Sequence, residues 1–188
     1  LARKYENNMS DQEQSARRID DTGALVVSNR VEPGIPENIL NDFLDEGVVG
    51  LTVYDNTPSL DPDNLDTDNR TGRGSVSDLE KFSRVGGYIL AHRHEGKRII
   101  VGRARPGCLR IDRVKHSDGR ETVLKSVQLA AYADIEPNEF KGIHDIATES
   151  GLTRHTFTGL DEDERADHIE QIVAAVTTLE REGRLNYR

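Results

Sequence analysis

The sequence lacks tryptophan altogether and is poor in other aromatic residues, in cysteine, in methionine and in lysine. Its single cysteine, Cys108, cannot form an internal disulfide, and its position between glycine and leucine is typical of a small buried apolar residue rather than a nucleophile. No stretch approaches the roughly 18 consecutive apolar residues of a transmembrane helix. The N-terminal residues also lack the apolar centre of a signal peptide. A soluble protein of a reducing cytoplasm is therefore expected.

The length of 188 residues is that of one domain with an ordinary hydrophobic core. Residues 1–21 are polar and show no sustained hydrophobic period, so they are expected to form a disordered or frayed N-terminal segment. Residues 22–188 are expected to form the single folded domain.

Acidic residues outnumber basic ones by 34 to 25, and most of the basic residues are arginine. This composition is typical of proteins from a high-salt cytoplasm, where a dense carboxylate surface keeps a protein hydrated. A formal charge of -9 would ordinarily argue against a nucleic-acid partner, but in such a proteome the local distribution of charge is more informative. Between residues 93 and 125 the local charge becomes positive. This positive stretch could contact phosphates or could equally form a solvated strand face. The basic residues of this stretch are Arg93, Lys97, Arg98, Arg103, Arg105, Arg110, Arg113, Lys115, Arg120 and Lys125.

Apolar runs separated by turn residues predict about six strands. Gly96 can take the positive φ of the hairpin turn between the third and fourth strands, and Gly102 predicts a bulge or the close approach of another backbone. Residues 55–78 carry almost no apolar side chains and predict a long solvated loop. The strands are expected at 24–28, 48–54, 88–92, 98–104, 108–114 and 122–130.

Three helices are expected beside these strands, so the predicted fold class is α+β. The first ends at Gly47, a second short one covers 138–148, and the third is a C-terminal helix over 161–182 that Gly183 ends. The apolar residues of the last helix recur with a 3.6-residue period. Its apolar stripe consists of Ile169, Ile172, Val176 and Leu179.

Motifs of the common catalytic classes are absent: there is no phosphate-binding GxxxxGK[ST], no GxSxG and no CxxC. His92 and His94 share a strand face and could hold a metal ion with a third ligand, or form an ordinary histidine pair at a hairpin end. A nuclease site built from Asp112, Glu121 and Lys125 is disfavoured, because the last two lie about 13 Å apart along an extended strand. No catalytic residue, metal or cofactor is therefore expected, and a metal-dependent hydrolase is the less favoured alternative.

The order of these elements resembles the PUA-like family of small barrels, which includes EVE and YTH domains. The similarity is greatest to the EVE-like modules of modification-dependent restriction proteins. It implies a small β-barrel of about six strands flanked by helices, in which Tyr54 or Tyr88 stands where such domains carry tryptophan. The matching pieces are 47–51, Leu79 with Phe82, 86–91, 99–104, 122–128 and 156–160.

This resemblance implies a module without catalytic activity that binds DNA or RNA or recognises a modified base, as in a restriction or defence system. A base is expected to stack on Tyr54 or Tyr88, with Asp55 accepting a hydrogen bond. Arg103 and Arg105 are expected to contact phosphate. No membrane partner is expected.

The alternative is a structural or protein-interaction domain. In that case the C-terminal helix, Glu162 to Arg181, would dock on a partner or on a second copy of the chain. An exposed apolar stripe on this helix would favour the alternative.

Overall fold

The described part of the chain contains nine strands and five helices. The computed structural model describes residues 23–29, 37–52, 70–93, 96–115, 118–119, 121–153 and 156–188. The strands are β1 (Ala24–Asn29), β2 (Val48–Thr52), β3 (Gly87–Arg93), β4 (Arg98–Ala104), β5 (Leu109–Lys115), β6 (Glu121–Gln128), β7 (Ala131–Ile135), β8 (Phe157–Leu160) and β9 (Asn186–Tyr187). The helices are α2 (Glu37–Asp45), α3 (Arg70–Val85), α4 (Ile143–Thr148), α5 (Ser150–Thr153) and α6 (Glu162–Arg181). The predicted segment 1–21 and the candidate residues Tyr54, Asp55 and His94 lie outside the described residues.

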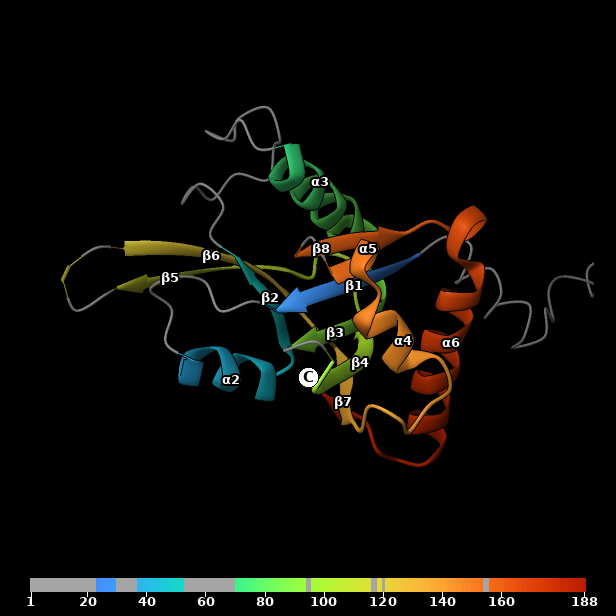
Figure 1. Cartoon of the computed structure of the whole chain (residues 1–188). Helices are drawn as coiled ribbons and strands as arrows, with labels where there is room; N and C mark the ends of the chain where they lie inside the picture. Colours follow the sequence, from blue (N-terminus) through green and yellow to red (C-terminus); the bar gives the residue numbers. More distant parts are fainter. Residues whose placement is uncertain are drawn as a thin grey trace, which may run out of the picture.

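The strands form two separate sheets. A six-stranded sheet has the order β8-β1-β3-β4-β7-β9, and a three-stranded sheet has the order β2-β6-β5. Within the larger sheet β1 and β3 are parallel, and the other neighbours are antiparallel. Figure 1 shows α4, α5 and α6 on one side of the larger sheet, and α2 with the β5–β6 ribbon on the other.

The six-stranded sheet is the middle layer because its central strands are apolar on both faces. All six residues of β1 are buried, and alternate side chains enter two different cores. Leu25 and Val27 belong to the ribbon-side core, with α2, α3 and the smaller sheet. Ala24 and Val26 belong to the helix-side core, with α4 and α6.

The prediction of an α+β fold is confirmed, but the prediction of a closed barrel is wrong. A small barrel buries only the inner face of each strand, and its strands alternate apolar and polar residues. Here β1, and β4 over Ile99, Ile100 and Val101, are buried continuously, so a covering layer is needed on each side. Two sheets and five helices provide these layers within the described residues.

The six predicted strands are confirmed as β1 to β6, and three further strands were missed. Strand β7 reads AYADI, and its small alanines have low β propensity. Strand β9 has two residues and is too short to show a period. These strands form because neighbouring strands provide backbone hydrogen-bond partners, and the local sequence does not show where those neighbours lie.

The loop predicted at 55–78 is wrong from residue 70 onward, because α3 begins there. Val76, Leu79 and Phe82 are spaced three apart and are buried on one helical face. Gly72 and Gly74 have low helix propensity and hide the helix from a sequence pattern. Tertiary packing of the apolar face therefore decides this helix.

Helix α3 also covers the free edge of β8. The hydroxyl oxygen of Ser75 accepts a hydrogen bond from the Phe157 backbone N–H at 2.8 Å. Two residues along the strand, the Asp78 carboxylate accepts one from the Gly159 N–H at 2.9 Å. These two side chains satisfy edge donors that would otherwise be open to another strand.

The apolar stripe of α6 is buried inside the chain's own core. Its four residues, Ile169, Ile172, Val176 and Leu179, are at most 2% exposed and pack in the helix-side core. The observation that would favour docking through this stripe is therefore absent. In the described part of the chain, neither α6 nor any other helix is long and apolar enough to cross a membrane.

Cys108 is buried in the ribbon-side core, as expected. Burial raises the pKa of its thiol to about 11, because the charged thiolate loses its hydration. The thiol is therefore protonated at neutral pH and a poor nucleophile.

Candidate functional site

Four residues that lie directly opposite one another form a row across four strands of the larger sheet. Tyr88 on β3 pairs with Arg103 on β4, Arg103 pairs with Ala131 on β7, and Ala131 pairs with Tyr187 on β9. Residues paired in this way point to the same face of a sheet. Adjacent strands are about 4.8 Å apart, so the backbones of the two tyrosines are about 14 Å apart. We call these four residues the tyrosine–arginine row.

The row lines a surface groove with a cavity volume of about 440 Å³. Among the described residues the exposed large hydrophobic side chains are Val85, Ile111 and Tyr187, and two of these three lie in this groove. Tyr187 is 64% exposed. Exposed aromatic and apolar side chains gathered in one hollow mark a ligand or partner surface. The other lining residues are Gly87, Ala104, Arg105, Pro106 and Ala130.

Close backbone packing holds the walls of this groove. A side chain at Gly86 would lie 2.5 Å from the Ala104 carbonyl oxygen, so only glycine lets the end of α3 meet the end of β4. The Gly107 N–H donates to the Ser83 carbonyl oxygen at 2.6 Å and joins the same two segments. Arg105 and Val85 are thereby brought to one side of the groove.

Gly102 permits the close approach of β4 and β7, as its position in the sequence predicted. A Cβ atom at this residue would lie 2.3 Å from the Ala131 carbonyl oxygen. The Ala130 N–H donates to the Arg103 carbonyl oxygen at 2.8 Å, and the Arg188 N–H donates to the Ala130 carbonyl oxygen at 2.9 Å. This chain of contacts places β9, and with it Tyr187, beside the groove.

The two arginines of the groove differ in their surroundings. The Arg103 guanidinium donates from Nη2 to Glu180 Oε1 of α6 at 2.7 Å. Arg105 is exposed and has no ion-pair partner among the described residues. In the described part of the chain, the groove thus contains one exposed arginine without an ion-pair partner, Arg105, and one arginine that is paired with a carboxylate, Arg103.

The structure brings three of the five predicted site residues together. Tyr88, Arg103 and Arg105 line the same groove, whereas Tyr54 and Asp55 lie outside the described residues. Tyr132, the tyrosine of β7, is 6% exposed and donates its hydroxyl proton to the Asp45 carbonyl oxygen at 3.0 Å. It is a structural residue.

Sequence reasoning missed Tyr187 and Glu180. Tyr187 lies in a strand of two residues, which is too short to show a hydrophobic period, so no local sequence pattern marks it. Glu180 lies on a charged helical surface and becomes notable only through its contact with Arg103.

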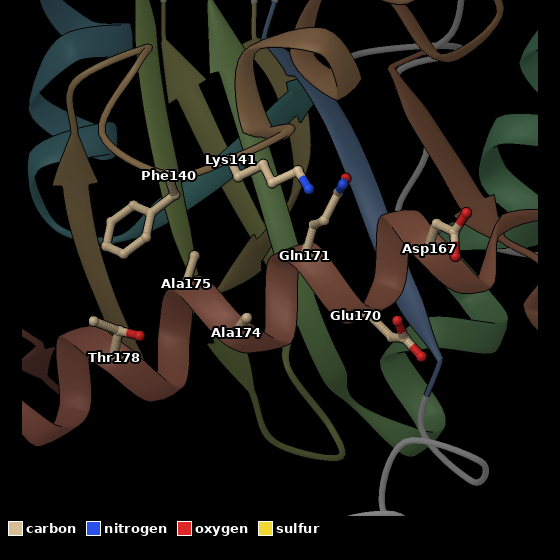
Figure 2. A pocket seen from close by; sticks show the side chains of 8 residues that line it. All are labelled: Phe140, Lys141, Asp167, Glu170, Gln171, Ala174, Ala175 and Thr178. Atoms are coloured by element: carbon tan, nitrogen blue, oxygen red, sulfur yellow. The ribbon is translucent and has the colours of Figure 1, made fainter.

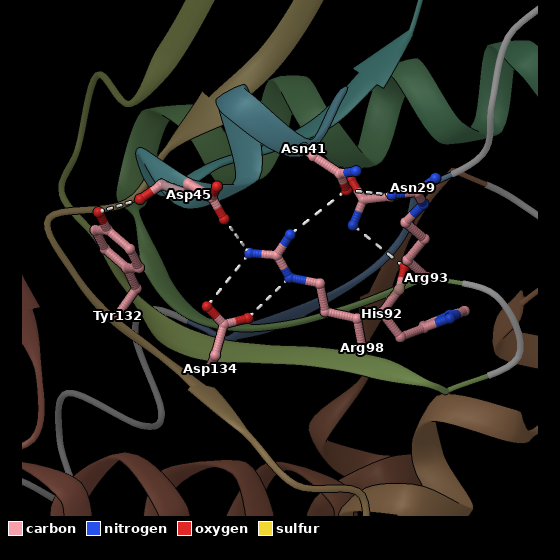
Figure 3. Close-up of polar contacts among 8 residues, drawn as sticks. All are labelled: Asn29, Asn41, Asp45, His92, Arg93, Arg98, Tyr132 and Asp134. Atoms are coloured by element: carbon pink, nitrogen blue, oxygen red, sulfur yellow. Dashed lines mark hydrogen bonds and ion pairs between the residues drawn. The ribbon is translucent and has the colours of Figure 1, made fainter. Parts of the chain in front are cut away.

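Other arginines of the basic stretch join α2 to the sheet instead of forming a patch. Figure 3 shows the Arg98 guanidinium between Asp45 of α2 and Asp134 of β7, and it bonds to Asp134 at 3.0 Å. The pKa of Arg98 is raised, chiefly by the hydrogen bond to Asp134. Arg93 donates to the Asn41 side chain of the same helix. These cations are used in holding α2.

The arginines of β5 are also engaged within the ribbon. Arg110 lies over the Phe43 ring, 5.2 Å from its centroid, and pairs with Asp112 at 2.8 Å. Arg113 pairs with Glu121 at 2.7 Å. The six described arginines of the basic stretch therefore lie in three places, and of these places the groove is the one where an exposed tyrosine side chain accompanies the arginines.

Within the described residues, the metal and nuclease sites considered from sequence are not formed. His92 is 3% exposed, and its neighbour in the pattern, His94, lies outside the described residues. No group of three His, Cys, Asp or Glu side chains within the described ranges is arranged to hold a metal ion. Lys125 is fully buried, and Asp112 is paired with Arg110.

A titratable cluster joins the end of α4 to the start of α6. His168 Nε2 lies 2.8 Å from Glu149 Oε2, and Arg165 donates to the other carboxylate oxygen. Arg165 has non-helical torsions, φ -131 and ψ 30, and marks a kink in α6. The pKa of Glu149 is lowered, first by the hydrogen bond with His168 and then by Arg165.

This cluster predicts a specific loss of stability in acid. A carboxylate whose pKa is lowered on folding stabilises the fold above its ordinary pKa of 4.5 and loses that contribution as the pH falls through the lower, folded value. The stability difference between the wild type and Glu149→Gln should therefore be full above pH 4.5 and shrink below it. Urea unfolding across pH measures this difference. A difference that stays constant to the acid limit of folding would contradict the assignment.

A second hollow, with a cavity volume of about 590 Å³, lies along the outer surface of α6. Figure 2 shows Lys141 reaching toward Gln171, with Phe140 beside Ala175 and Thr178. Asp167 and Glu170 are exposed at its rim. Its lining contains one ammonium group, two carboxylates and no aligned row of aromatic side chains, so it does not select one class of ligand.

The groove of the tyrosine–arginine row is therefore the stronger candidate site. It combines two phenol rings, an open cation and a paired cation on one sheet face. Comparisons of the chain with protein-family models, with curated proteins and with solved structures find no match. The chemistry of the groove carries the functional argument by itself.

Proposed function

We propose that this chain is a non-catalytic module that binds nucleic acid through the groove of the tyrosine–arginine row. Unpaired bases stack on Tyr88 and Tyr187, and phosphates meet Arg103 and Arg105. The observation that carries the proposal is the register that aligns two tyrosines and an arginine across four strands. Stacking of a base on an aromatic ring contributes about 1–3 kcal/mol and tolerates any sequence.

The chemistry of the groove favours unpaired over paired bases. In a duplex each base face is covered by its neighbours, so a protein ring can stack only on a base that is splayed out. The two tyrosine backbones, about 14 Å apart, leave Arg103 and the small Ala131 between the rings. A phosphate linking stacked nucleotides has room there to approach the guanidinium.

The acidic surface restricts binding to this place. With a formal charge of -9 the chain repels polyanions over most of its surface, so non-specific phosphate binding is weak. Affinity must then come largely from stacking, which salt does not screen. This division suits a protein that works in a high-salt cytoplasm.

The motif order that resembles PUA-like and EVE-like modules supports the same proposal. In its finer form the ligand carries a modified base, and the module serves a restriction or defence system. The roles predicted for Tyr54 and Asp55 belong to this finer form, and both residues lie outside the described part of the chain. The protein-interaction alternative loses its main support, because the apolar stripe of α6 is buried.

Binding of labelled single- and double-stranded DNA and RNA, with and without modified bases and over a series of KCl concentrations, tests the proposal. Tyr187→Ala is expected to weaken binding of the preferred polymer about 5- to 150-fold, since one stacking platform is lost. Tyr187 is 64% exposed, so the variant should fold normally. Ile111→Ala, at the exposed hydrophobic residue outside the groove, is the matched control and should bind as the wild type does.

Two results would count against the proposal. Failure of the folded wild type to bind any polymer at any salt concentration would contradict the proposed nucleic-acid binding. Equal losses in Tyr187→Ala and Ile111→Ala would remove the groove as its site. Circular dichroism of each variant shows that the fold is intact.

A further inference from the structure

The ion pair between Arg103 and Glu180 lies at the rim of the groove and is accessible to a ligand. The Arg103 side chain is 31% exposed and that of Glu180 is 44% exposed, with Nη2 and Oε1 2.7 Å apart. Within the described residues, this is the ion pair that includes an arginine of the groove. Its carboxylate comes from α6, whereas its guanidinium comes from the sheet.

Glu180 occupies a helix position that disfavours a carboxylate. It lies in the last turn of α6, at the negative end of the helix dipole. A glutamate there weakens the helix terminus instead of supporting it. The favourable contact that the structure gives it is with Arg103, and a surface pair of this kind contributes only about 0.2–1 kcal/mol.

Carboxylate and phosphate oxygens compete for the same guanidinium donors. Arginine binds both through its planar fork of N–H groups, with similar geometry and distance. The Glu180 oxygen therefore stands where an oxygen of a bound phosphate would stand. A phosphate placed beside an undisplaced carboxylate would also meet like-charge repulsion.

We infer that Glu180 is an intramolecular competitor for the phosphate site on Arg103. The inference rests on the proposed function and adds a selectivity element to it. A ligand that offers only phosphate can bind Arg105 alone, because Glu180 occupies the Arg103 guanidinium. A ligand that also stacks on Tyr88 and Tyr187 gains enough to displace the carboxylate, so Glu180 favours nucleotides with unpaired bases over simple polyanions.

Glu182 provides a matched control on the same helix end. Its carboxylate pairs with Arg184 at 3.0 Å, and neither residue lines the groove. Glu180→Gln and Glu182→Gln change the net charge by the same amount, at positions only two residues apart. A difference between them therefore reports the contact with Arg103 and not the general field of the protein.

The test is the binding of labelled oligothymidine and oligouridine to full-length wild type, Glu180→Gln and Glu182→Gln over a series of KCl concentrations. Glu180→Gln is expected to bind about three- to tenfold more tightly, because Arg103 is released and the repulsion is removed. Its plot of log affinity against log salt should steepen by up to about 0.7, as one further phosphate contact requires. Glu182→Gln should change affinity less than about twofold.

A double-mutant cycle separates competition from a structural effect of Glu180. In an Arg103→Ala background the gain from Glu180→Gln should fall to that of Glu182→Gln, because no guanidinium is left to release and only the change in net charge remains. A Glu180→Gln gain as large there as in the wild-type background would overturn the inference. Equal behaviour of the two glutamine variants would also overturn it, as would weaker binding by Glu180→Gln, which would mean that Glu180 orients Arg103.

The two proposals fail in different ways. Absence of wild-type binding, or normal binding by Arg103→Ala and Arg105→Ala, would contradict the proposed function and the inference together. Wild-type binding that depends on both arginines, combined with a Glu180→Gln variant that matches Glu182→Gln, would contradict the inference alone.

Discussion

Replacing Asn29 with alanine is expected to lower the free energy of unfolding by about 2–4 kcal/mol, because two buried backbone groups lose their partners. Asn29 is 5% exposed at the end of β1. Its Oδ1 accepts the Gly50 N–H at 2.7 Å, and its Nδ2 donates to the His92 carbonyl oxygen at 3.2 Å. Figure 3 shows this side chain beside the network that holds α2. One amide therefore joins β1 to the smaller sheet and to β3.

Urea unfolding followed by circular dichroism measures this effect as a shift of the midpoint at constant slope. Asn186→Ala is the control, since Asn186 is exposed on β9 and should change stability by no more than about 0.5 kcal/mol. If Asn29→Ala unfolds at the same urea concentration as the control, the two hydrogen bonds do not hold the sheets together.

Replacing Gly102 with alanine is expected to cost about 3 kcal/mol of stability and to weaken nucleic-acid binding as well. The added methyl group would lie 2.3 Å from the Ala131 carbonyl oxygen and 3.0 Å from the Tyr132 Cα. Both are backbone atoms, which cannot turn aside as a side chain can. Strands β4 and β7 must separate, and this displaces Arg103 from Ala131 in the row that lines the groove.

Gly159→Ala is the matched control for Gly102→Ala. Gly159 is also a strand glycine, but its added methyl group would lie 3.5 Å from the Asp78 carboxylate, which is ordinary contact. Its stability should change by less than about 1 kcal/mol. Thermal unfolding gives the stabilities, and oligonucleotide binding well below both midpoints gives the affinities. A Gly102→Ala variant that binds and unfolds like Gly159→Ala would contradict the role given to the β4–β7 contact.

Under the proposed function, the groove, its acidic surroundings and Glu180 all favour ligands with unpaired bases over simple polyanions. The surface charge lowers the affinity for any polyanion, and Glu180 lowers it further at the one arginine of the row. Stacking on the two tyrosines is left as the favourable contribution that distinguishes ligands. In the proposed function, selectivity for unpaired bases therefore comes as much from what the site repels as from what it binds.

Local patterns were sufficient for the elements whose signal lies within a few residues. The apolar runs of β1, β3 and β4 and the 3.6-residue period of α6 predicted those elements correctly. Gly47, Gly96 and Gly183 have φ values of 74°, 84° and 66°, as the turns and helix ends assigned to them require. In each case the conformation is set by the residue and its immediate neighbours.

The same patterns could not show α3, β7 to β9 or the division into two sheets. Helix α3 is stabilised by packing of Val76 and Leu79 and by the edge of β8, which is about eighty residues away in the sequence. The burial of β1 was visible in the sequence as an apolar run. The sequence did not show whether a barrel or two covering layers would bury this strand.

For the candidate site, the sequence by itself determined the chemistry of Tyr88, Arg103 and Arg105 and the acidic background around them. Only the tertiary structure decided that these three residues share a groove, that Tyr187 joins them and that Glu180 holds one of the arginines. The physical reason is that a sheet brings residues together by strand register. Register depends on long-range contacts, such as the approach of β7 that Gly102 permits, and these leave no period in the sequence.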